Sequence, residues 1–305
     1  MVDSDPNINP EAVSENPQGD GCPEVDTQPK IVYPIYRAGG IPLAENPSEC
    51  MNPIQEGGLV LLWFDNEVTY LIEVKRGKRV GIHCGSPLLV DDWIGKEYGT
   101  KVVCQHGEGF LLKPTMDDLM MKASRESGII YPKDAAFLMI KSGIASGSKV
   151  LEVGTGSGSL TMALAQAVAP TGHVHTFDRR TDLPQNAVRN IARAGLNAYV
   201  TFHQREAAEP FPEKGFDAVI LDIPTPWEEV DVVKEALAGG GHLVSLNPTF
   251  NQIETMAEAL RTRGFIQVEC CELLQRPILA RAGKTRPVQR MVSHTEFLLF
   301  AIRPA

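Results

Sequence analysis

The sequence contains no apolar run near the roughly 18 residues that a membrane-spanning helix needs. Its N-terminus has neither a basic segment nor an apolar stretch behind it, so we expect no secretory signal. The six cysteines show no CxxC pair, and the adjacent Cys270 and Cys271 would point to opposite faces of a strand. We therefore expect a cytoplasmic protein with free thiols, no bound metal and no membrane contact.

The charge of the chain is unevenly distributed. The net charge of −9 at first argues against a nucleic-acid partner, but residues 1–57 hold ten acidic and two basic residues. The remainder holds 28 acidic and 27 basic residues, with two acid-free basic clusters at 75–79 and 276–290. Clustered cations are typical of RNA-binding surfaces. Each cluster could also be an ordinary solvated surface, and for residues 75–79 both readings stay open.

The chain divides into four regions by composition and pattern. Residues 1–57 are polar, rich in proline and without period, which predicts a mostly disordered tail. Residues 58–113 predict a small antiparallel β domain, and residues 114–132 predict a linker helix, capped by Thr115 behind Pro114, and a junction. The alternating stretches that suggest the β domain are 59–64, 69–74, 80–83 and 100–112.

Residues 133–305 alternate between strand and helix patterns, as a parallel sheet covered by helices requires. The last two predicted elements are both strands, which predicts a hairpin at the end of this region. Helices are expected near 133–143, 159–169, 182–195, 227–238 and 250–263. Strands are expected near 149–153, 173–177, 198–203, 217–222, 241–246, 265–275 and 291–302.

The stretch Lys149 to Leu160, KVLEVGTGSGSL, is the centre of this region. A short apolar strand leads into glycines at positions 154, 156 and 158, and a helical pattern follows at once. Glycine permits a tight strand-to-helix turn and lets a ligand approach the backbone, while the first amides of the helix point toward it. Such a turn alone is weak evidence, because glycines also end strands for structural reasons.

Two later strand ends strengthen the prediction of a nucleotide site. Asp178 ends the next strand, close to the spacing at which an acid meets ribose hydroxyls in dinucleotide folds. Ser159 stands where a dinucleotide pattern has glycine, which favours another adenosine-bearing cofactor over NAD. The strand at 218–221 ends in Asp222-Ile-Pro-Thr-Pro-Trp227, where open α/β sheets place ligands.

Six motifs stand in order along the chain: WIGKEYGTKV, LLKPTMDDL, YPKDAAFL, LEVGTGSGSLT, LDIPTPW and VSHTEFL. Together they resemble the tRNA adenine-58 N1-methyltransferases, which use S-adenosylmethionine, and the resemblance extends over about residues 58 to 305. It implies a class I methyltransferase fold, a Rossmann-like seven-stranded sheet whose last strand is inserted antiparallel, behind a small antiparallel β domain. It also implies that 133–305 is the catalytic, cofactor-binding domain, and that tRNA is the partner. The bacterial and archaeal branch implies a homotetramer, and the eukaryotic branch a hetero-oligomer with a related subunit.

The resemblance also assigns residues to roles. The cofactor would lie over the turn 154–160, with its ribose at Asp178 and its adenine near residues 206–208; Arg180 and Asp182 keep the family spacing behind that acid. The predicted cofactor residues are Glu152, Gly154, Gly156, Ser157, Gly158, Ser159, Leu160, Asp178, Arg180, Glu206, Ala207 and Asp222. The predicted RNA-binding residues are Arg281, Lys284, Arg286, Arg290 and His294, although a lone histidine on a last strand is more often structural.

We predict Asp222 and Tyr131 as the catalytic residues. A carboxylate that accepts a hydrogen bond from adenine N6 would orient the base and stabilise the positive charge that develops as N1 is alkylated. Asp222 could instead cap the next helix. Tyr131 could stack on the base or line the cofactor site, or it could only anchor the junction.

Three alternatives remain at this point. A methyltransferase for a non-RNA substrate would share the glycine turn and Asp178 but would not need the segment 222–227 or the basic cluster at 276–290. A non-catalytic tRNA-binding subunit would typically have lost the turn and the strand-end acid, and both are present here. An NAD-dependent dehydrogenase is disfavoured by Ser159.

Overall fold

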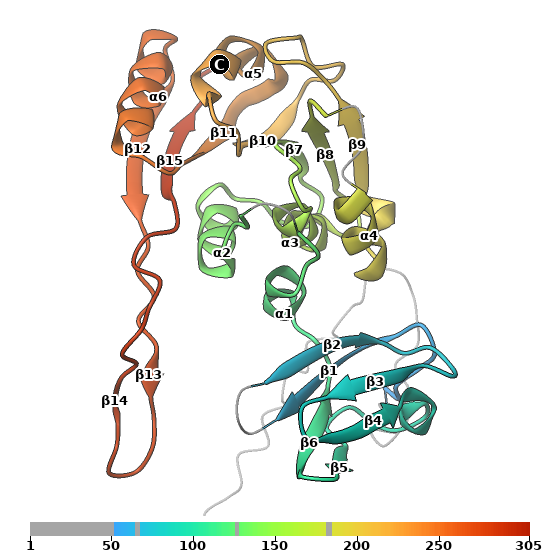
Figure 1. Ribbon diagram of the computed structural model, residues 1–305. Coiled ribbons are helices and arrows are strands. Elements are labelled where there is room, and N and C mark those ends of the chain that lie inside the picture. The colour runs from blue at the N-terminus through green and yellow to red at the C-terminus, as the bar shows by residue number, and fades with distance from the viewer. Residues whose placement is uncertain (1–51, 65–67, 126–127, 181–184) are drawn as a thin grey trace, which may run out of the picture. The chain divides into compact units, whose positions relative to one another are not determined.

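The computed structural model describes residues 52–64, 68–125, 128–180 and 185–305 (Figure 1). Most of the predicted tail and Asp182 lie outside these ranges. In the part that is described, no helix combines the length and the apolar character needed to cross a membrane.

The N-terminal strands form the predicted antiparallel β domain. Four of them make one sheet in the order β2-β1-β6-β5, and β3 and β4 pair as a separate hairpin. Strand β4 was not predicted, because Pro87 lies inside it and proline is unusual within strands. The elements are β1 Leu59–Phe64, β2 Thr69–Glu73, β3 Arg79–Ile82, β4 Gly85–Leu89, a 3-10 helix Val90–Trp93, β5 Lys101–Cys104 and β6 Gly107–Leu112.

The packing of this domain begins before the predicted boundary at residue 58. Ile54 is fully buried in the domain's core. The N–H of Gly57 donates to the carbonyl of Val74 at 2.7 Å. The apolar side chain of Ile54 stands alone in a polar stretch, so periodicity could not identify it as a core residue.

The second sheet has seven strands in the order β12-β15-β11-β10-β7-β8-β9. The last strand, β15, lies antiparallel between β11 and β12, as predicted. The elements are α1 Met116–Met121, α2 Pro132–Lys141, β7 Lys149–Val153, α3 Ser159–Val168, β8 His173–Asp178, α4 Gln185–Arg193, a 3-10 helix Asn197–Tyr199, β9 Val200–Gln204, β10 Phe216–Leu221, a 3-10 helix Pro226–Glu229, α5 Val230–Ala236, β11 Leu237–Asn247, α6 Phe250–Thr262, β12 Ile266–Glu272, β13 Ile278–Leu279, β14 Arg286–Pro287 and β15 Phe297–Ile302.

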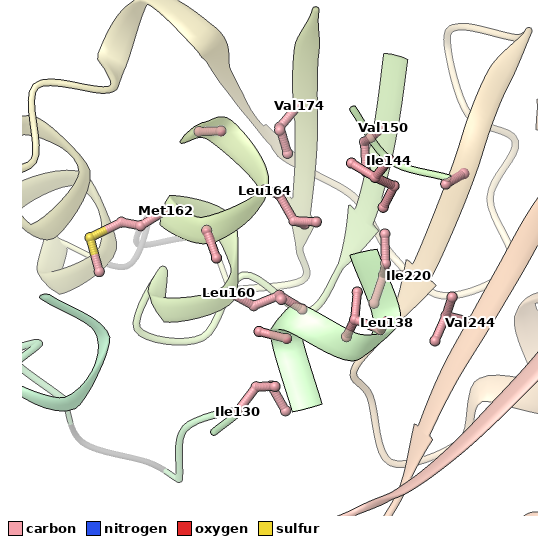
Figure 2. Close-up of a cluster of buried hydrophobic side chains, with 14 of the residues drawn as sticks. Ile130, Leu138, Ile144, Val150, Leu160, Met162, Leu164, Val174, Ile220 and Val244 are labelled. Carbon is pink, nitrogen blue, oxygen red and sulfur yellow. The ribbon is translucent and has the colours of Figure 1, made fainter. Parts of the chain in front are cut away.

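Successive residues of the central strands point to opposite faces, and each face has its own core. Val150 on β7 belongs to one cluster, with Leu138 of α2 and Leu164 of α3 (Figure 2) and with further residues of α1 and α4. Leu151 belongs to the other cluster, with residues of α5 and α6. Leu298 and Leu299 on β15 divide between the clusters in the same way. The sheet is therefore covered on both faces, which explains why its strands read as nearly continuous apolar runs.

Local sequence explains several helix starts. Thr115 accepts a hydrogen bond from the N–H of Asp118 at 3.2 Å, and the Asp118 carboxylate accepts from the Thr115 N–H at 2.8 Å, so the predicted cap is part of a capping box. Pro132 occupies the first turn of α2. Thr249 caps α6 by accepting from the N–H of Gln252.

The segment between β12 and β15 differs from the prediction. We expected strands over 265–275 and 291–302, but the sheet strands end at Glu272 and begin again at Phe297. Between them β13 and β14 pair as a hairpin, with Ile278 opposite Pro287, and it projects beyond the ends of β12 and β15 (Figure 1). Its strands are two residues long and exposed, so they carry no apolar alternation that a sequence could reveal.

Candidate active site

The candidate site lies at one edge of the seven-stranded sheet. In the parallel register Val153 pairs with Phe177 and with Leu221, so Gly154, Asp178 and Asp222 follow these three strands at the same edge. The sequence placed these residues at strand ends, and the register brings them together at the position where open α/β sheets bind ligands.

The three glycines of the turn serve different purposes. Gly154 has a φ of +104°, and a Cβ there would overlap the main-chain carbonyl of Asp222. Gly158, with a φ of +75°, would bring a Cβ within 3.0 Å of Ala187 on α4. Gly156 has a φ of +54°, and no atom of the described residues lies within 4 Å of the position its Cβ would take. Two glycines therefore permit packing between backbone segments, and Gly156 is the one that faces open space.

The start of α3 offers polar groups to that space. Ser159 and Leu160 are in the first turn of the helix, where main-chain N–H groups have no acceptor within the helix. The side chain of Leu160 is part of the core, but the Ser159 hydroxyl is buried and has no hydrogen-bond partner among the described residues. The neighbouring Ser157 is held by its carbonyl, which accepts from Nδ2 of Asn190 at 2.9 Å.

Asp178 is bound by Arg180. The guanidinium donates to both carboxylate oxygens, with Nε at 2.9 Å and Nη2 at 2.7 Å, and the Arg180 N–H donates as well at 3.1 Å. Burial by itself would raise the pKa of Asp178, but these hydrogen bonds and the positive charge outweigh it and lower the pKa. Asp178 is therefore ionised and fixed in orientation.

Glu152 lies buried below the turn. Its Oε2 accepts hydrogen bonds from the hydroxyls of Thr161 at 2.6 Å and Thr176 at 2.7 Å. Burial, with a smaller effect of the Asp222 and Asp178 charges, raises the pKa of Glu152 to about 8 in spite of these bonds. Glu152 thus holds a proton at neutral pH, and it connects the strand under the turn to α3 and β8.

Asp222 is partly buried and does not cap the following helix. Thr225 is the N-cap of the 3-10 helix Pro226–Glu229. The Asp222 N–H donates to the Val153 carbonyl at 2.8 Å, which fixes the backbone beside the glycine turn. In the described parts of the chain no hydrogen bond reaches its carboxylate, and burial raises the pKa of Asp222 to about 6. An acceptor that is shielded from water but unpaired is suited to binding a polar ligand.

Glu296 is a site residue that sequence analysis did not select. It immediately precedes β15, whose first residue, Phe297, pairs with Asn247 at the end of β11. Its Oε2 is buried without a hydrogen-bond partner among the described residues. Burial, together with the charge of Asp222, raises the pKa of Glu296 to about 7. The only signal in the sequence was its position within the SHTEFL motif.

A buried network joins the YPKD and SHTEFL motifs. Lys133 donates to both oxygens of Asp134, at 2.7 and 2.8 Å, and to the Thr295 hydroxyl at 2.6 Å. Thr295 in turn donates to Asp134 at 2.7 Å, and Asp134 is fully buried. The network therefore joins the start of α2, where Tyr131 is the N-cap without a side-chain capping bond, to Thr295, the residue before Glu296.

A second buried pair supports the predicted adenine-binding loop. Arg205 donates to Glu229 at 2.8 Å, and Glu229 also accepts from the N–H of Ala208 at 3.0 Å. Ala208 has a φ of +60°, an uncommon conformation for a residue with a Cβ. Glu206 and Ala207 are exposed on this loop. Sequence reasoning missed both Arg205 and Glu229, because their pairing spans 24 residues and two strand ends.

The two basic clusters differ in their surroundings. In the cluster 75–79, Lys75 pairs with Glu73, Arg76 pairs with Glu56, and Lys78 donates to the Glu73 carbonyl. This pairing favours the reading of a solvated surface for that cluster. The residues 273–296 between β12 and β15 are called the β13–β14 segment below. Where the structure describes the chain, no acid pairs with the arginine and lysine side chains of this segment, and all of them are exposed: Arg276, Arg281, Lys284, Arg286 and Arg290.

His294 uses both ring nitrogens within the protein. Nδ1 lies 2.7 Å from a carboxylate oxygen of Glu272, and Nε2 lies 3.0 Å from the carbonyl of Pro248. The bond to Glu272 raises the pKa of His294, and the bond to Pro248 adds to the effect. The ring is exposed, so it can still lie beside a ligand. Its two nitrogens link the segment before β15 to Glu272 at the end of β12 and to Pro248 after β11.

These features fit an adenosine-bearing cofactor. The open space at Gly156 lets a ligand lie against the backbone. The Ser159 hydroxyl, which has no partner among the described residues, offers a polar group. The oriented Asp178 carboxylate can accept hydrogen bonds from ribose hydroxyls. The residues described include no group of three or more histidine, cysteine, aspartate or glutamate side chains arranged to hold a metal.

The family model described as tRNA methyltransferase complex GCD14 subunit matches residues 108–285, more than half of the chain. A relative from Methanocaldococcus jannaschii, a tRNA (adenine(57)-N(1)/adenine(58)-N(1))-methyltransferase, is 30% identical over 266 residues, which are 77% of this chain and 94% of the relative. A catalytic subunit of a tRNA (adenine(58)-N(1))-methyltransferase from Dictyostelium discoideum is 30% identical over 60% of this chain and 61% of its own length.

Two solved structures agree with this fold. An S-adenosylmethionine-dependent O-methyltransferase from Thermotoga maritima matches with a TM-score of 0.78 and 33% identity, over 83% of this chain and 95% of its own. A tRNA (m1A58) methyltransferase from Aquifex aeolicus matches with a TM-score of 0.73 and 29% identity, over 83% of this chain and all of its own. Both confirm the predicted class I methyltransferase fold, and the family match shows that the chain belongs to the GCD14 family of tRNA methyltransferase subunits.

Proposed function

We propose that this protein transfers a methyl group from S-adenosylmethionine to N1 of adenine 58 in the T-loop of tRNA. The observation that carries the proposal is the Asp222 carboxylate, shielded and unpaired among the described residues, at the same sheet edge as the glycine turn and Asp178. The names of the archaeal relative and of the Aquifex structure support the substrate.

The cofactor would lie over Gly156 and the first turn of α3. Asp178 would accept hydrogen bonds from its ribose hydroxyls while Arg180 keeps the carboxylate ionised, because two carboxylate oxygens offer more acceptor positions than the arginine occupies. The loop at 206–208, held by Glu229, would lie along its adenine. When bound, the cofactor supplies a methyl group on a positively charged sulfur, which the lone pair of the substrate's N1 can attack.

Asp222 would orient the substrate adenine. Its carboxylate accepts a hydrogen bond from the N6 amino group, which turns N1 toward the methyl group. As N1 gains the methyl group the ring becomes positively charged, and a negative carboxylate in a water-poor site stabilises that charge more than water would. Holding base and cofactor in line supplies a further part of the rate enhancement. Tyr131 would stack on the base or line the cofactor.

The β13–β14 segment would bind the tRNA backbone. Its cations Arg281, Lys284, Arg286 and Arg290 are exposed and have no acidic partner among the described residues, so no internal pair must be broken before they contact phosphates. Such contacts would help offset the few kcal/mol needed to extract a stacked base.

We further propose that the chain functions as an oligomer, a homotetramer or a complex with a related subunit. The β13–β14 segment exposes five large apolar side chains: Leu274, Ile278, Val288, Met291 and Val292. Clusters of exposed apolar side chains usually mark a surface that binds a partner. Light scattering of the purified chain tests this directly: a monomer at micromolar concentration would favour the hetero-oligomer.

Incubation with labelled S-adenosylmethionine and unmodified tRNA tests the activity. We expect label in the RNA and a reverse-transcription stop at position 58, because N1-methylation blocks base pairing. Asp222→Ala should abolish transfer, whereas Asp231→Asn, an exposed acid paired with Arg263, should leave it unchanged. Equal transfer by Asp222→Ala would remove the assignment of this residue but keep the activity.

The name of the Thermotoga structure supports a second candidate, methyl transfer to an oxygen of a substrate other than RNA. The same assay separates the two, because that enzyme would leave the tRNA unlabelled. A non-catalytic subunit would bind tRNA without any transfer, and it would bind S-adenosylmethionine weakly or not at all.

A further inference from the structure

In the strand order, β15, which follows Glu296, and β7, which leads into the glycine turn, lie on opposite sides of β10, which leads into Asp222. Phe297 pairs with Asn247, and Ser245 of the same strand pairs with Leu221, so Glu296 and Asp222 lie at one sheet edge, on strands separated by β11. Residue 296 is partly exposed, but its Oε2 is buried and unpartnered among the described residues. The mechanism above gives this group no role.

Several charged groups face Glu296. Asp222 follows β10, Asp134 and Lys133 come from α2, and His294 precedes it in the same segment. Asp134 is already satisfied by Lys133 and Thr295, and His294 by Glu272 and Pro248. The remaining interaction is therefore that between the two carboxyl groups of Glu296 and Asp222.

Two neighbouring carboxyl groups in a water-poor site do not ionise independently. Burial, with the added effect of the Asp222 charge, raises the pKa of Glu296 to about 7, whereas burial raises the pKa of Asp222 to about 6. We assign the shared proton to Glu296, because its buried Oε2 has no hydrogen-bond donor among the described residues to stabilise a negative charge and because its pKa is raised the more. A protonated carboxyl offers one O–H donor and one carbonyl acceptor, the pattern of an asparagine or glutamine amide.

We propose that Glu296 is a specificity-determining residue that reads the Hoogsteen edge of the target adenine, donating to N7 and accepting from N6. This rests on the proposed function. The N6 amino group has two protons, one beside N1 and one beside N7, so Asp222 and Glu296 can each accept one of them. Amide side chains recognise adenine by the same N6 and N7 pair, and guanine presents two acceptors there instead.

The test uses tRNA assembled with 7-deazaadenosine at position 58, which replaces the N7 acceptor by C–H. With ordinary tRNA, Glu296→Ala should lower kcat/KM about 10- to 100-fold, the usual discrimination of a bidentate base contact. Glu296→Gln preserves the donor and acceptor pattern and should stay within a few-fold of wild type. Glu269→Gln, an exposed glutamate paired with Lys141, is the matched control and should equal wild type.

The modified tRNA separates recognition from structure. It should lower kcat/KM about tenfold or more for wild type and for Glu296→Gln, and it should cause no further loss in Glu296→Ala. Equal losses in all three proteins, or no loss in wild type, would overturn the proposal. If Glu296→Ala does not fold, the modified tRNA still tests the proposal in wild type and Glu296→Gln, because an undiminished kcat/KM in either protein would overturn it.

Binding of S-adenosylmethionine, measured by calorimetry, should be unchanged in both variants, since Glu296 is assigned to the base and not to the cofactor. Loss of that binding would assign Glu296 to the cofactor site and refute the proposal. If wild type fails to methylate ordinary tRNA, the proposed function itself is wrong. If wild type methylates ordinary tRNA and its kcat/KM is the same on the 7-deazaadenosine tRNA, only the role of Glu296 is wrong.

Discussion

Gly154→Ala should damage the position of Asp222 more than it damages the cofactor site. An added Cβ would overlap the main-chain carbonyl oxygen of Asp222, and it would lie 2.9 Å from that carbonyl carbon and 3.2 Å from Cγ2 of Ile223. The φ of +104° is also strained for any residue with a Cβ. The strained dihedral costs about 1–3 kcal/mol. Displacing a packed neighbour costs a further ~1–3 kcal/mol.

The sum predicts a loss of about 2–6 kcal/mol, and a chain of this size loses ~2–4 °C in Tm for each kcal/mol. A shift of the Asp222 turn by about 1 Å would also lower kcat on the order of 100-fold. Gly143→Ala is the control. Its φ is +67°, and none of the described residues has an atom within 4 Å of the new Cβ, so the substitution carries strain of about 1–2 kcal/mol without an overlap among them.

Thermal unfolding and single-turnover methylation measure the two effects. We expect Gly154→Ala to unfold several degrees below Gly143→Ala and to lose activity that Gly143→Ala retains. If both variants had the same Tm and the same kcat, the close approach of the two strand-end turns would not be what requires glycine at position 154.

Three further predictions follow from the same contacts. Asp134→Asn leaves a nearly buried lysine without its ion pair, so it should lower stability by about 3–5 kcal/mol in chemical denaturation. The kcat/KM of wild type should rise with pH through about 6 as Asp222 loses its proton and fall through about 7 as Glu296 loses its own, and Glu296→Gln should remove the alkaline fall. Replacing Arg281 and Lys284 by glutamine should weaken tRNA binding and reduce the slope of log Kd against log salt by about 1 for each charge removed.

Each of these has a clear contrary result. Unchanged stability of Asp134→Asn would mean that the network is not buried in solution. A flat pH profile between 5 and 8 would remove the assignment of separate protonation states to the two carboxyl groups. A salt dependence identical to wild type in the double variant would exclude the β13–β14 segment from the RNA interface.

The sequence predicted the architecture of the large sheet because its signals are local. The strand β7, the glycine turn and α3 follow one another within twenty residues, as a short apolar run, three glycines at alternate positions and an apolar helical segment. The antiparallel final strand was predicted from the order of elements together with the methyltransferase-type sheet that this order fits. The hairpin at 276–290 was missed, since two-residue exposed strands have neither burial nor period.

What only the tertiary structure decided is which side chains meet. The sequence placed Asp222 at a strand end but left open whether it caps the next helix. The structure shows that Thr225 is the N-cap residue and that the Asp222 N–H donates to the carbonyl of Val153, beside the glycine turn. Glu296 comes to the same edge because β15, the strand that follows it, lies antiparallel beside β11, although Glu296 is far from Asp222 in the sequence. The state of a carboxyl group depends on burial and on neighbouring charge, and both are set by residues distant in sequence, which is why the local pattern identified the sheet edge but not the pair of acids on it.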